Sequence, residues 1–501
     1  MTKRLTRRGV LTGMGASVMA SALTSVALAN APTRSIAPKP RPADAIKRTV
    51  SGLDALLAKA RFSGKIGFVV ADARTGLVLE ARNPGLDLPP ASVAKAVTSA
   101  YALSSLGSAH RFSTRLVATG PVSGGKIKGD LVLLGGGDPV LDTNALAGMA
   151  KALKDKGIRG VTGKFRYHAG ALPYVKAIDP EQPDHLGYNP AISGLNLNYN
   201  RVHFEWKRAG DGYSVAMDAR SDRYRPAVNS ARMKIVNRKM PVYTYKAAAG
   251  VDNWTVARGA LGKGGSRWLP VRRPDLYTAE VFQVLARAQG VSLPKPVAAK
   301  SAPKGTVIVQ RNSEPLDKIA RAMLKYSTNL TAEIVGLSAS KARGDTPGNL
   351  ASSGKMMTAW VKQNFAAKSV RFADHSGLSD ASRLSADDMV KMLVKLGPDH
   401  ALHGLMKEIT PRGEDGKKLA GASHKIRAKT GTLNFVSALS GYVTASDGTP
   451  LAFAIFTADM NKRKAIKRAD RERPAGAKAW SRRSRWLQYQ LLNRWAVLYG
   501  T

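Results

Sequence analysis

Apolar residues at four-residue spacing mark the first long helix of the chain, directly after a pair of prolines. Val93, Val97 and Tyr101 would share one face of this helix. Pro90 suits its first position, because a proline lacks the N–H that would have no intrahelical partner there. The pattern therefore predicts a helix that opens near Pro90 and buries an apolar stripe.

Short apolar runs between turn residues predict strands near both ends of the chain. The clearest of them are residues 66–71, 77–81, 437–444 and 450–457. The first two flank a turn-like segment and predict a β-hairpin, and the last two predict neighbouring strands of a meander. A long middle region, residues 111–300, has many short β-like runs and one helical stretch at 144–156. We interpret this region as a β-rich insertion.

Helical periodicity returns after Pro315. Apolar residues recur at 316, 319, 320, 323 and 324, and this run leads directly into Ser327-Thr328-Asn329. A polar turn at 374–379 precedes another amphipathic helix, and an apolar helix is predicted at 486–498. The second half of the chain is therefore expected to supply most of the helices.

Composition narrows the classes of function. The chain has 501 residues, of which 44% are hydrophobic, enough for one large domain or two to three smaller ones. It contains no cysteine, which excludes disulfides and thiolate chemistry. The formal net charge of +43 favours anionic partners, but no nucleic-acid-binding motif accompanies it. We predict no nucleic-acid partner, no cofactor and no metal site.

The first residues carry the pattern of an export signal. Arg7 and Arg8 form a twin-arginine signature, and a short stretch rich in Gly, Ala and Ser comes directly after them. Small residues near Ala29 and Ala31 fit a cleavage site. We predict a signal peptide of the twin-arginine type at 1–31 and a Pro- and Lys-rich linker at 32–48. The mature chain is expected to be periplasmic and to lack a transmembrane segment.

Ser92 and Lys95 form an S-x-x-K pair at the start of the predicted helix, where one turn places them on the same side. A serine hydroxyl becomes a nucleophile when a neutral lysine of lowered pKa takes its proton. The same spacing occurs at Ser301 and at Ser352, so the pair is not specific on its own. It indicates a catalytic site only in combination with further motifs later in the chain.

Two later motifs complete an ordered series. Ser327 and Asn329 form an S-x-N element at the end of a predicted helix. Lys429, Thr430 and Gly431 form the single K-T-G of the chain, on a strand expected to lie at a sheet edge. S-x-x-K, S-x-N and K-T-G in this order are the signature of penicillin-binding proteins and class A β-lactamases. Neither Ser301 nor Ser352 leads such a series.

The chain resembles the low-molecular-mass, class C penicillin-binding proteins, which are D-alanyl-D-alanine carboxypeptidases and endopeptidases. The long gap between Lys95 and Ser327 fits the large insertion of that family. The stretches 129–141 and 374–379 are also similar, although His375 stands where the family usually has glycine. The basic stretch 462–485 is interpreted as an addition to the family pattern.

The resemblance implies an α+β fold, in which a five-stranded antiparallel sheet is flanked by helices and interrupted by a large β-rich insertion. The catalytic domain of the serine β-lactamase and transpeptidase type would be discontinuous, comprising residues 49–110 and 301–501. The insertion would comprise residues 111–300, in two subdomains.

The resemblance also implies how an acyl-enzyme would form. Ser92 would attack the carbonyl of the penultimate D-Ala, with Lys95 as the base. Ser327 would relay a proton to the leaving amine. The backbone N–H groups of Ser92 and Thr432 would form the oxyanion hole.

The remaining motif residues would bind substrate. Asn329 would hydrogen-bond the substrate amide and hold the catalytic lysine. Lys429 would lower the pKa of that lysine by charge repulsion and, with Thr430, bind the terminal carboxylate. Gly431 has no side chain, so a ligand backbone could approach the strand closely there. Thr432 completes the substrate-binding set.

The resemblance therefore predicts a serine-type D-Ala-D-Ala carboxypeptidase or endopeptidase that acts on peptidoglycan peptides and is inhibited by β-lactams. No Glu-x-x-Leu-Asn comes after the second motif, so slow release of penicillin is expected. A β-lactamase or esterase of the same superfamily and a non-catalytic cell-wall-binding protein are the alternatives. The stretch 462–485 is expected to favour residence on the anionic wall polymer without entering the chemistry.

Overall fold

The computed structural model describes residue 47 and residues 50–500. The predicted signal peptide at 1–31 and all but Lys47 of the predicted linker at 32–48 lie outside the described residues. The chain from Val50 onward forms one compact unit. Within the described part of the chain, no helix combines the length and apolar character needed to cross a bilayer.

A six-stranded antiparallel sheet, in the order β17-β18-β19-β20-β1-β2, joins the two ends of the described chain. Its strands are β1 (Lys65–Asp72), β2 (Val78–Arg82), β17 (Lys407–Ile409), β18 (Lys425–Leu433), β19 (Val436–Thr444) and β20 (Pro450–Ala458). The predicted hairpin and meander are both present, and β1 pairs along its whole length with β20. The short edge strand β17 adds a sixth strand to the five that were expected.

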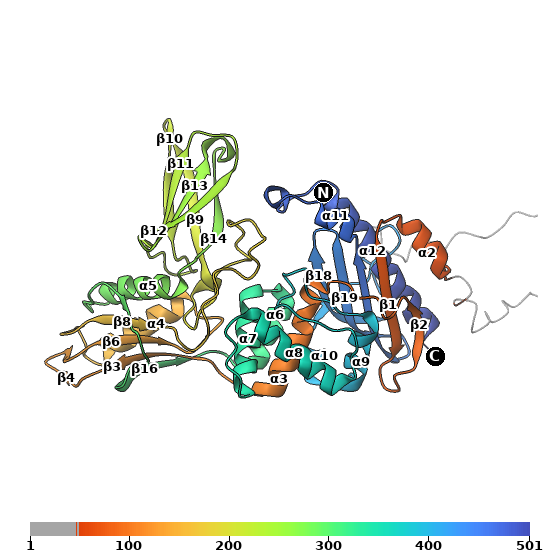
Figure 1. Ribbon diagram of the computed structural model, residues 1–501, viewed down its shortest axis with the longest axis horizontal. Helices are drawn as coiled ribbons and strands as arrows, with labels where there is room; N and C mark the ends of the chain where they lie inside the picture. The colour runs from red at the N-terminus through yellow and green to blue at the C-terminus, as the bar shows by residue number, and fades with distance from the viewer. Residues whose placement is uncertain (1–46, 48–49, 501) are drawn as a thin grey trace, which may run out of the picture. The chain divides into compact units, whose positions relative to one another are not determined.

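Strand β1 shows why helices cover both faces of this sheet. Its side chains alternate, so Phe68 and Val70 pack with α12 (Ala477–Leu498) and α2 (Leu53–Ala60). Val69 and Ala71 pack on the opposite face, with the helices that lie on the other side of the sheet in Figure 1. A strand that is apolar on both faces must be buried on both, which gives a helix–sheet–helix arrangement.

The second layer of helices carries most of the active-site motifs. It consists of α3 (Ala94–Leu106), α6 (Leu316–Tyr326), α7 (Asn329–Ala342), α8 (Leu350–Phe365), α9 (Ala386–Leu396) and α10 (Ala401–Leu405). The periodicity that predicted α6 is confirmed, because Leu316, Ile319 and Met323 are all buried. The predicted fold class is confirmed as well: the fold is α+β, with an antiparallel sheet between helices.

The inserted region has sheets and a hydrophobic core of its own. A five-stranded sheet in the order β15-β8-β6-β3-β16 consists of β3 (Ser113–Ala118), β6 (Leu131–Gly135), β8 (Phe165–His168), β15 (Val297–Ala298) and β16 (Thr306–Asn312). It packs with α4 (Thr143–Asp155) and α5 (Pro274–Ala288) (Figure 1). Strand β16 pairs with β3, so the inserted sheet extends past the predicted boundary at residue 300.

Three smaller sheets complete the insertion. Their strands are β4 (Val122–Ser123), β5 (Lys126–Ile127), β7 (Gly160–Val161), β9 (Arg201–Ala209), β10 (Gly212–Asp218), β11 (Ala231–Val236), β12 (Tyr243–Ala248), β13 (Val251–Ala257) and β14 (Gly264–Pro270). The larger two have the strand orders β10-β9-β14 and β11-β13-β12. The short β-like runs predicted for the insertion are thus present, in part as β-ribbons beyond the five-stranded sheet.

Candidate active site

Ser92 lies in a single 3-10 turn, Ala91–Val93, that leads directly into α3. The sequence predicted a regular helix from Pro90, but Ala91 has a positive φ of 46°, so the α-helix begins only after the serine. Lys95, in the first turn of α3, donates a hydrogen bond from Nζ to Ser92 Oγ at 3.0 Å. The predicted pairing of serine and lysine across one turn is therefore present.

Lys95 is fully buried among acceptors. Its Nζ donates to Asn329 Oδ1 at 2.8 Å and to the Ser376 carbonyl at 2.7 Å, in addition to Ser92. Burial lowers the pKa of Lys95 to about 8, while the nearby carboxylates of Glu333 and Asp374 act in the opposite direction. An amine with this pKa is neutral in about a tenth of molecules at pH 7, against far fewer for an exposed lysine. The site thus holds a lysine that can accept a proton.

The second and third motifs meet beside this lysine. Ser327 caps α6 in a left-handed conformation, and its Oγ accepts a hydrogen bond from Lys429 Nζ at 3.0 Å. Lys429 also donates to the Thr430 carbonyl and is 1% exposed. Burial first, and then the charge of Lys95, hold the pKa of Lys429 well below its usual range. The predicted repulsion between the two lysines is present, but burial is the largest cause of the lowered pKa of Lys95.

Strand β18 presents a free edge to the site. Strand β17 pairs only with residues 426–428, so no strand of the described chain pairs with residues 429–433 on that side. The prediction of an edge strand for the K-T-G motif is confirmed. Free backbone N–H and C=O groups along such an edge can pair with an extended peptide.

Gly431 is required for a reason that the sequence did not suggest. Thr430 and Thr432 are exposed on one side of β18, whereas Gly431 is buried on the other. A Cβ at Gly431 would lie 2.7 Å from the Pro90 carbonyl oxygen and 3.1 Å from the Ser92 nitrogen. The missing side chain therefore admits the turn that carries the nucleophile, a contact that the sequence did not predict.

A cavity of about 300 Å³ opens onto Ser92. It is lined by Ser92, Gln182, Tyr188, Ser327, Asn329, Gly377, Leu378, Thr432, Leu433, Asn434, Arg463, Arg471 and Glu472. Two of these side chains, Gln182 and Tyr188, come from the insertion. Three others, Arg463, Arg471 and Glu472, come from the basic stretch that was expected to stay outside the chemistry. The sequence did not predict that this part of the stretch lines the cavity.

Glu333 is the site residue that sequence reasoning missed on the other side of Lys95. It is fully buried, and its two carboxylate oxygens accept the backbone N–H groups of His375 and Ser376. These contacts hold the peptide whose Ser376 carbonyl accepts from Lys95. A carboxylate within the apolar run of α7, one turn after Asn329, was the available signal.

His375 lies in a loop, as predicted, but it is fully buried. Its ring stacks parallel to that of Tyr101, and its Nε2 lies 2.7 Å from Ser353 Oγ. A Cβ at Gly336 would lie 2.1 Å from the imidazole. The turn accommodates a histidine in place of glycine because α7 has no side chain at the facing position.

The S-x-x-K pairs that begin at Ser301 and Ser352 do not form comparable sites. Ser352 lies in the first turn of α8, where its backbone N–H donates to the side chain of the N-cap residue Asn349 and its Oγ donates to the Asn349 carbonyl. Ser301 and Lys304 lie in a loop segment, and the serine is exposed. Of these three serines, Ser92, which motif order selected, is the one with a buried lysine partner.

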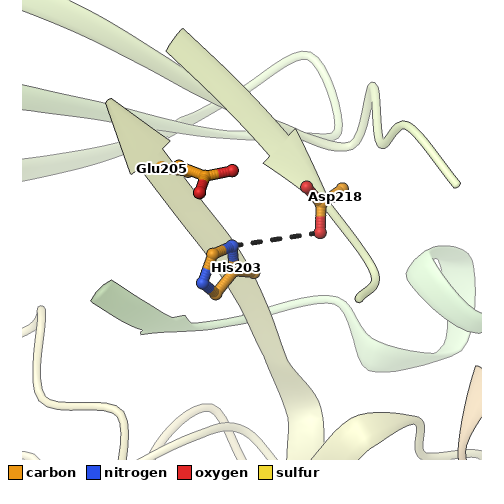
Figure 2. A group of neighbouring side chains, drawn as sticks. All are labelled: His203, Glu205 and Asp218. Atoms are coloured by element: carbon orange, nitrogen blue, oxygen red, sulfur yellow. Dashed lines mark ion pairs between the residues drawn. The ribbon is translucent and has the colours of Figure 1, made fainter. Parts of the chain in front are cut away.

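The described residues contain one group with the composition of a metal site, His203 and Glu205 on β9 with Asp218 on β10 (Figure 2). His203 Nδ1 lies 4.0 Å from Asp218 Oδ1. However, the Arg220 guanidinium contacts Glu205 at 2.6 Å and Asp218 at 2.9 Å. Since an arginine already neutralises both carboxylates, we interpret this group as an ion-pair cluster of the insertion.

Comparisons with known proteins agree with this geometry. The chain is 27% identical to the D-alanyl-D-alanine carboxypeptidase of Actinomadura sp. (strain R39), over 88% of this chain and 87% of that protein. It is 23% identical to the D-alanyl-D-alanine carboxypeptidase DacB of Haemophilus influenzae, over 80% and 87% of the two chains.

The crystal structure of penicillin-binding protein 4 from Haemophilus influenzae shares the fold, with a TM-score of 0.66 and 20% identity over 84% of this chain and 98% of that one. The family model for D-Ala-D-Ala carboxypeptidase 3 (S13) matches residues 49–475. These findings confirm the predicted resemblance and the predicted class of serine carboxypeptidase. The chain belongs to the D-Ala-D-Ala carboxypeptidase 3 (S13) family.

Proposed function

We propose that the protein hydrolyses the terminal D-Ala–D-Ala bond of peptidoglycan stem peptides through an acyl-enzyme on Ser92. The observation that carries this proposal is the buried Lys95 amine, which contacts both Ser92 Oγ and Asn329 Oδ1. A nucleophile, a base of lowered pKa and an open cavity are thereby combined at one place. The remaining site residues then have definable roles.

Acylation begins with proton transfer from Ser92 to neutral Lys95. The Oγ attacks the carbonyl carbon of the penultimate D-Ala, and the resulting oxyanion accepts hydrogen bonds from the backbone N–H groups of Ser92 and Thr432. Each such donor stabilises a transition state by about 3 kcal/mol. The close packing of the Ser92 turn on Gly431 supports this pairing, because it brings the turn next to the strand residue that precedes Thr432.

Departure of the terminal D-Ala requires a proton on its nitrogen. Ser327 is placed to relay it, since Lys429 donates to its Oγ and leaves the hydroxyl proton free to move. The exposed Thr430 can hydrogen-bond the terminal carboxylate. Lys429 is buried, so it would favour that carboxylate through its charge and through Ser327 more than by direct contact.

Water then attacks the ester carbon, and the Ser92–acyl bond breaks to return the serine. β-Lactams would acylate the same hydroxyl. Glu472 is a carboxylate that lines the cavity, but both of its oxygens are already bound by His185 and Arg267. With no free carboxylate to activate water among the described lining residues, slow release of penicillin is expected.

The proposed substrate fixes the compartment. Stem peptides ending in D-Ala-D-Ala belong to the cell wall, and the predicted signal at 1–31 would bring the mature protein to the periplasm by the twin-arginine route. The net positive charge suits a polymer that carries carboxylates.

The nucleophile is tested by mass spectrometry after incubation with a labelled penicillin. One adduct per chain is expected, on the peptide that contains Ser92. Ser92→Ala should abolish it, and Ser352→Ala is the matched control that should retain it. Adduct on Ser92→Ala would refute the assignment.

The reaction is tested by digesting purified muropeptides and weighing the products. Loss of a terminal D-Ala indicates carboxypeptidase activity, and conversion of cross-linked dimers to monomers indicates endopeptidase activity. Rapid turnover of penicillin would favour the β-lactamase alternative, and absence of any product would favour a non-catalytic wall-binding protein.

A further inference from the structure

The part of the chain after the last strand of the catalytic sheet lies at the mouth of the cavity. We define the clamp segment as residues 463–472, between the end of α11 (Met460–Lys464) and the bend that precedes α12. We define the insertion loop as residues 179–189. The two segments are far apart in sequence, yet both line the cavity that opens onto Ser92.

Arginines of the clamp segment bind the outer turn of the insertion loop. Arg468 donates to the Gln182 carbonyl at 2.9 Å and contacts the Asp184 carboxylate at 3.2 Å. Arg471 donates to the Glu181 carbonyl at 2.8 Å, with the Glu181 carboxylate at 3.6 Å. Two backbone carbonyls of the loop are therefore held by guanidinium groups from the other end of the chain.

Glu472 adds a second kind of contact to the same loop. One carboxylate oxygen lies 2.8 Å from His185 Nε2, and the other lies 2.8 Å from Arg267 on β14. The hydrogen bond from His185, opposed by burial and reinforced by Arg267, lowers the pKa of Glu472 to about 2. The carboxylate is thus charged throughout the pH range in which a wall enzyme works.

The clamp segment is also fastened to the catalytic sheet. The Asn434 side chain, in the turn after β18, donates to the Arg471 carbonyl at 2.6 Å. Arg463 donates to the Asn434 carbonyl at 3.0 Å and to the Asp380 carboxylate at 2.7 Å. The segment therefore connects the K-T-G strand with the insertion loop across the cavity.

The insertion loop in turn contacts a catalytic motif. The Tyr188 carbonyl accepts a hydrogen bond from Asn329 Nδ2 at 2.9 Å, while Asn329 Oδ1 accepts one from Lys95. An amide carries two N–H donors, so one remains for the substrate. The Tyr188 carbonyl thus sets the orientation of the Asn329 side-chain amide, whose oxygen faces Lys95 and whose nitrogen faces the cavity.

We propose that the clamp segment holds the insertion loop so that the Tyr188 carbonyl keeps Asn329 oriented, and that Arg471 and Glu472 are positioning residues for acylation. This inference rests on the proposed function, because it assigns Asn329 to substrate binding. A small displacement of a catalytic group lowers rates strongly, since about 1 Å can cost about a hundredfold. Partly exposed ion pairs contribute little to stability, so a change in the clamp segment should lower the acylation rate without a matching loss of stability.

The test compares Glu472→Gln with the wild-type chain by single-turnover acylation with a fluorescent penicillin. We expect the rate to fall about tenfold while Tm changes by less than about 2 °C. The matched control is Arg482→Gln, which removes one charge from the exposed side of α12, and it should acylate at the wild-type rate. An unchanged rate in Glu472→Gln would overturn the inference.

A mutant cycle with Asn329→Ala distinguishes positioning from a general structural effect. If the clamp acts through Asn329, Glu472→Gln should slow acylation in the wild-type background and have no further effect in Asn329→Ala. Equal slowing in both backgrounds would contradict the inference. Hydrogen exchange gives a second measurement, because amides of residues 181–188 should exchange faster in Glu472→Gln while those of β18 stay protected. Unchanged exchange in the loop would also overturn it.

These outcomes are separable from failure of the proposed function. If wild-type Ser92 is not acylated at all, the proposed function fails first. If wild-type Ser92 is acylated normally and the Glu472 variant behaves identically, only the clamp inference fails.

Discussion

Replacing Gly431 by alanine should separate the nucleophile from the strand that it faces. The new Cβ would lie 2.7 Å from the Pro90 carbonyl oxygen, whereas carbon–oxygen contacts of this kind need about 3.3 Å. The 3-10 turn that carries Ser92 would have to move by about 0.6 Å relative to β18 to restore that separation. Because the neighbouring atoms belong to the backbone, no flexible side chain can move aside to relieve this contact.

That displacement acts on the two N–H groups proposed as the oxyanion hole. Since about 1 Å of misplacement can cost about a hundredfold in rate, we expect acylation of Gly431→Ala to fall at least about tenfold. Overpacking of this kind also destabilises by about 1–3 kcal/mol. Both changes should appear together.

The assay is penicillin acylation at Ser92 with Tm measured in parallel. Gly148→Ala is the matched control, because a Cβ there meets nothing within 4 Å on α4, and alanine is the better helix former. It should acylate normally and be slightly stabilised. If Gly431→Ala acylates within about threefold of wild type at unchanged Tm, the packing argument is wrong.

Three further predictions concern charge. Burial lowers the pKa of Lys95 to about 8, and the neutral amine is the base, so kcat/KM should rise with pH through about 8. A flat profile from about pH 6.5 to 9 would contradict this. Lys429→Ala should lose more than about tenfold in kcat/KM on D-Ala-terminated peptides; a smaller loss at unchanged Tm would exclude its role in binding the carboxylate. Changing exposed Arg482, Arg483 and Arg485 to Gln should weaken salt-sensitive pull-down by sacculi and leave small-peptide kcat/KM within about twofold; unchanged pull-down would show that these arginines only solvate the surface.

The last variant set reflects a division within the basic stretch. The sequence predicts one polymer-binding surface over all of 462–485. Arg463 and Arg468 instead contact the cavity wall and the insertion loop, so their replacement would also disturb the site. The arginines on the exposed side of α12 test wall binding without that complication.

The motifs were predictable because their chemistry is local. Ser92 and Lys95 are three residues apart, and the 3-10 turn that leads into α3 keeps them on the same side. The order of the three motifs then indicated the fold class and the family. For Gly431 the need for a missing side chain was predicted, but its contact with Pro90 was not, since only the folded chain shows that packing.

Contacts between distant segments were not predictable in this way. Glu472 meets His185 across 287 positions, and no periodicity or motif links two residues so far apart. The role of Glu333 was not predictable for a different reason. A single carboxylate in an apolar helix does not indicate which backbone N–H groups it will accept hydrogen bonds from. The sheet has six strands and not the expected five because of β17, which is too short to show a strand pattern in the sequence.

The pairing of β1 with β20 also determines when the catalytic sheet can form. Ser63, just before β1, hydrogen-bonds Asp459, just after β20, and the two lie 396 positions apart. The inner edge of the first hairpin in the described chain therefore stays uncovered until the last strand, β20, has been synthesised. Contacts of such separation slow folding, and an unpaired strand edge is open to aggregation in the meantime. A chain that ends at residue 450 would still contain the helices that carry the motifs, but it would lack β20 and should not fold. An intact C-terminal region is therefore required for a soluble, active preparation.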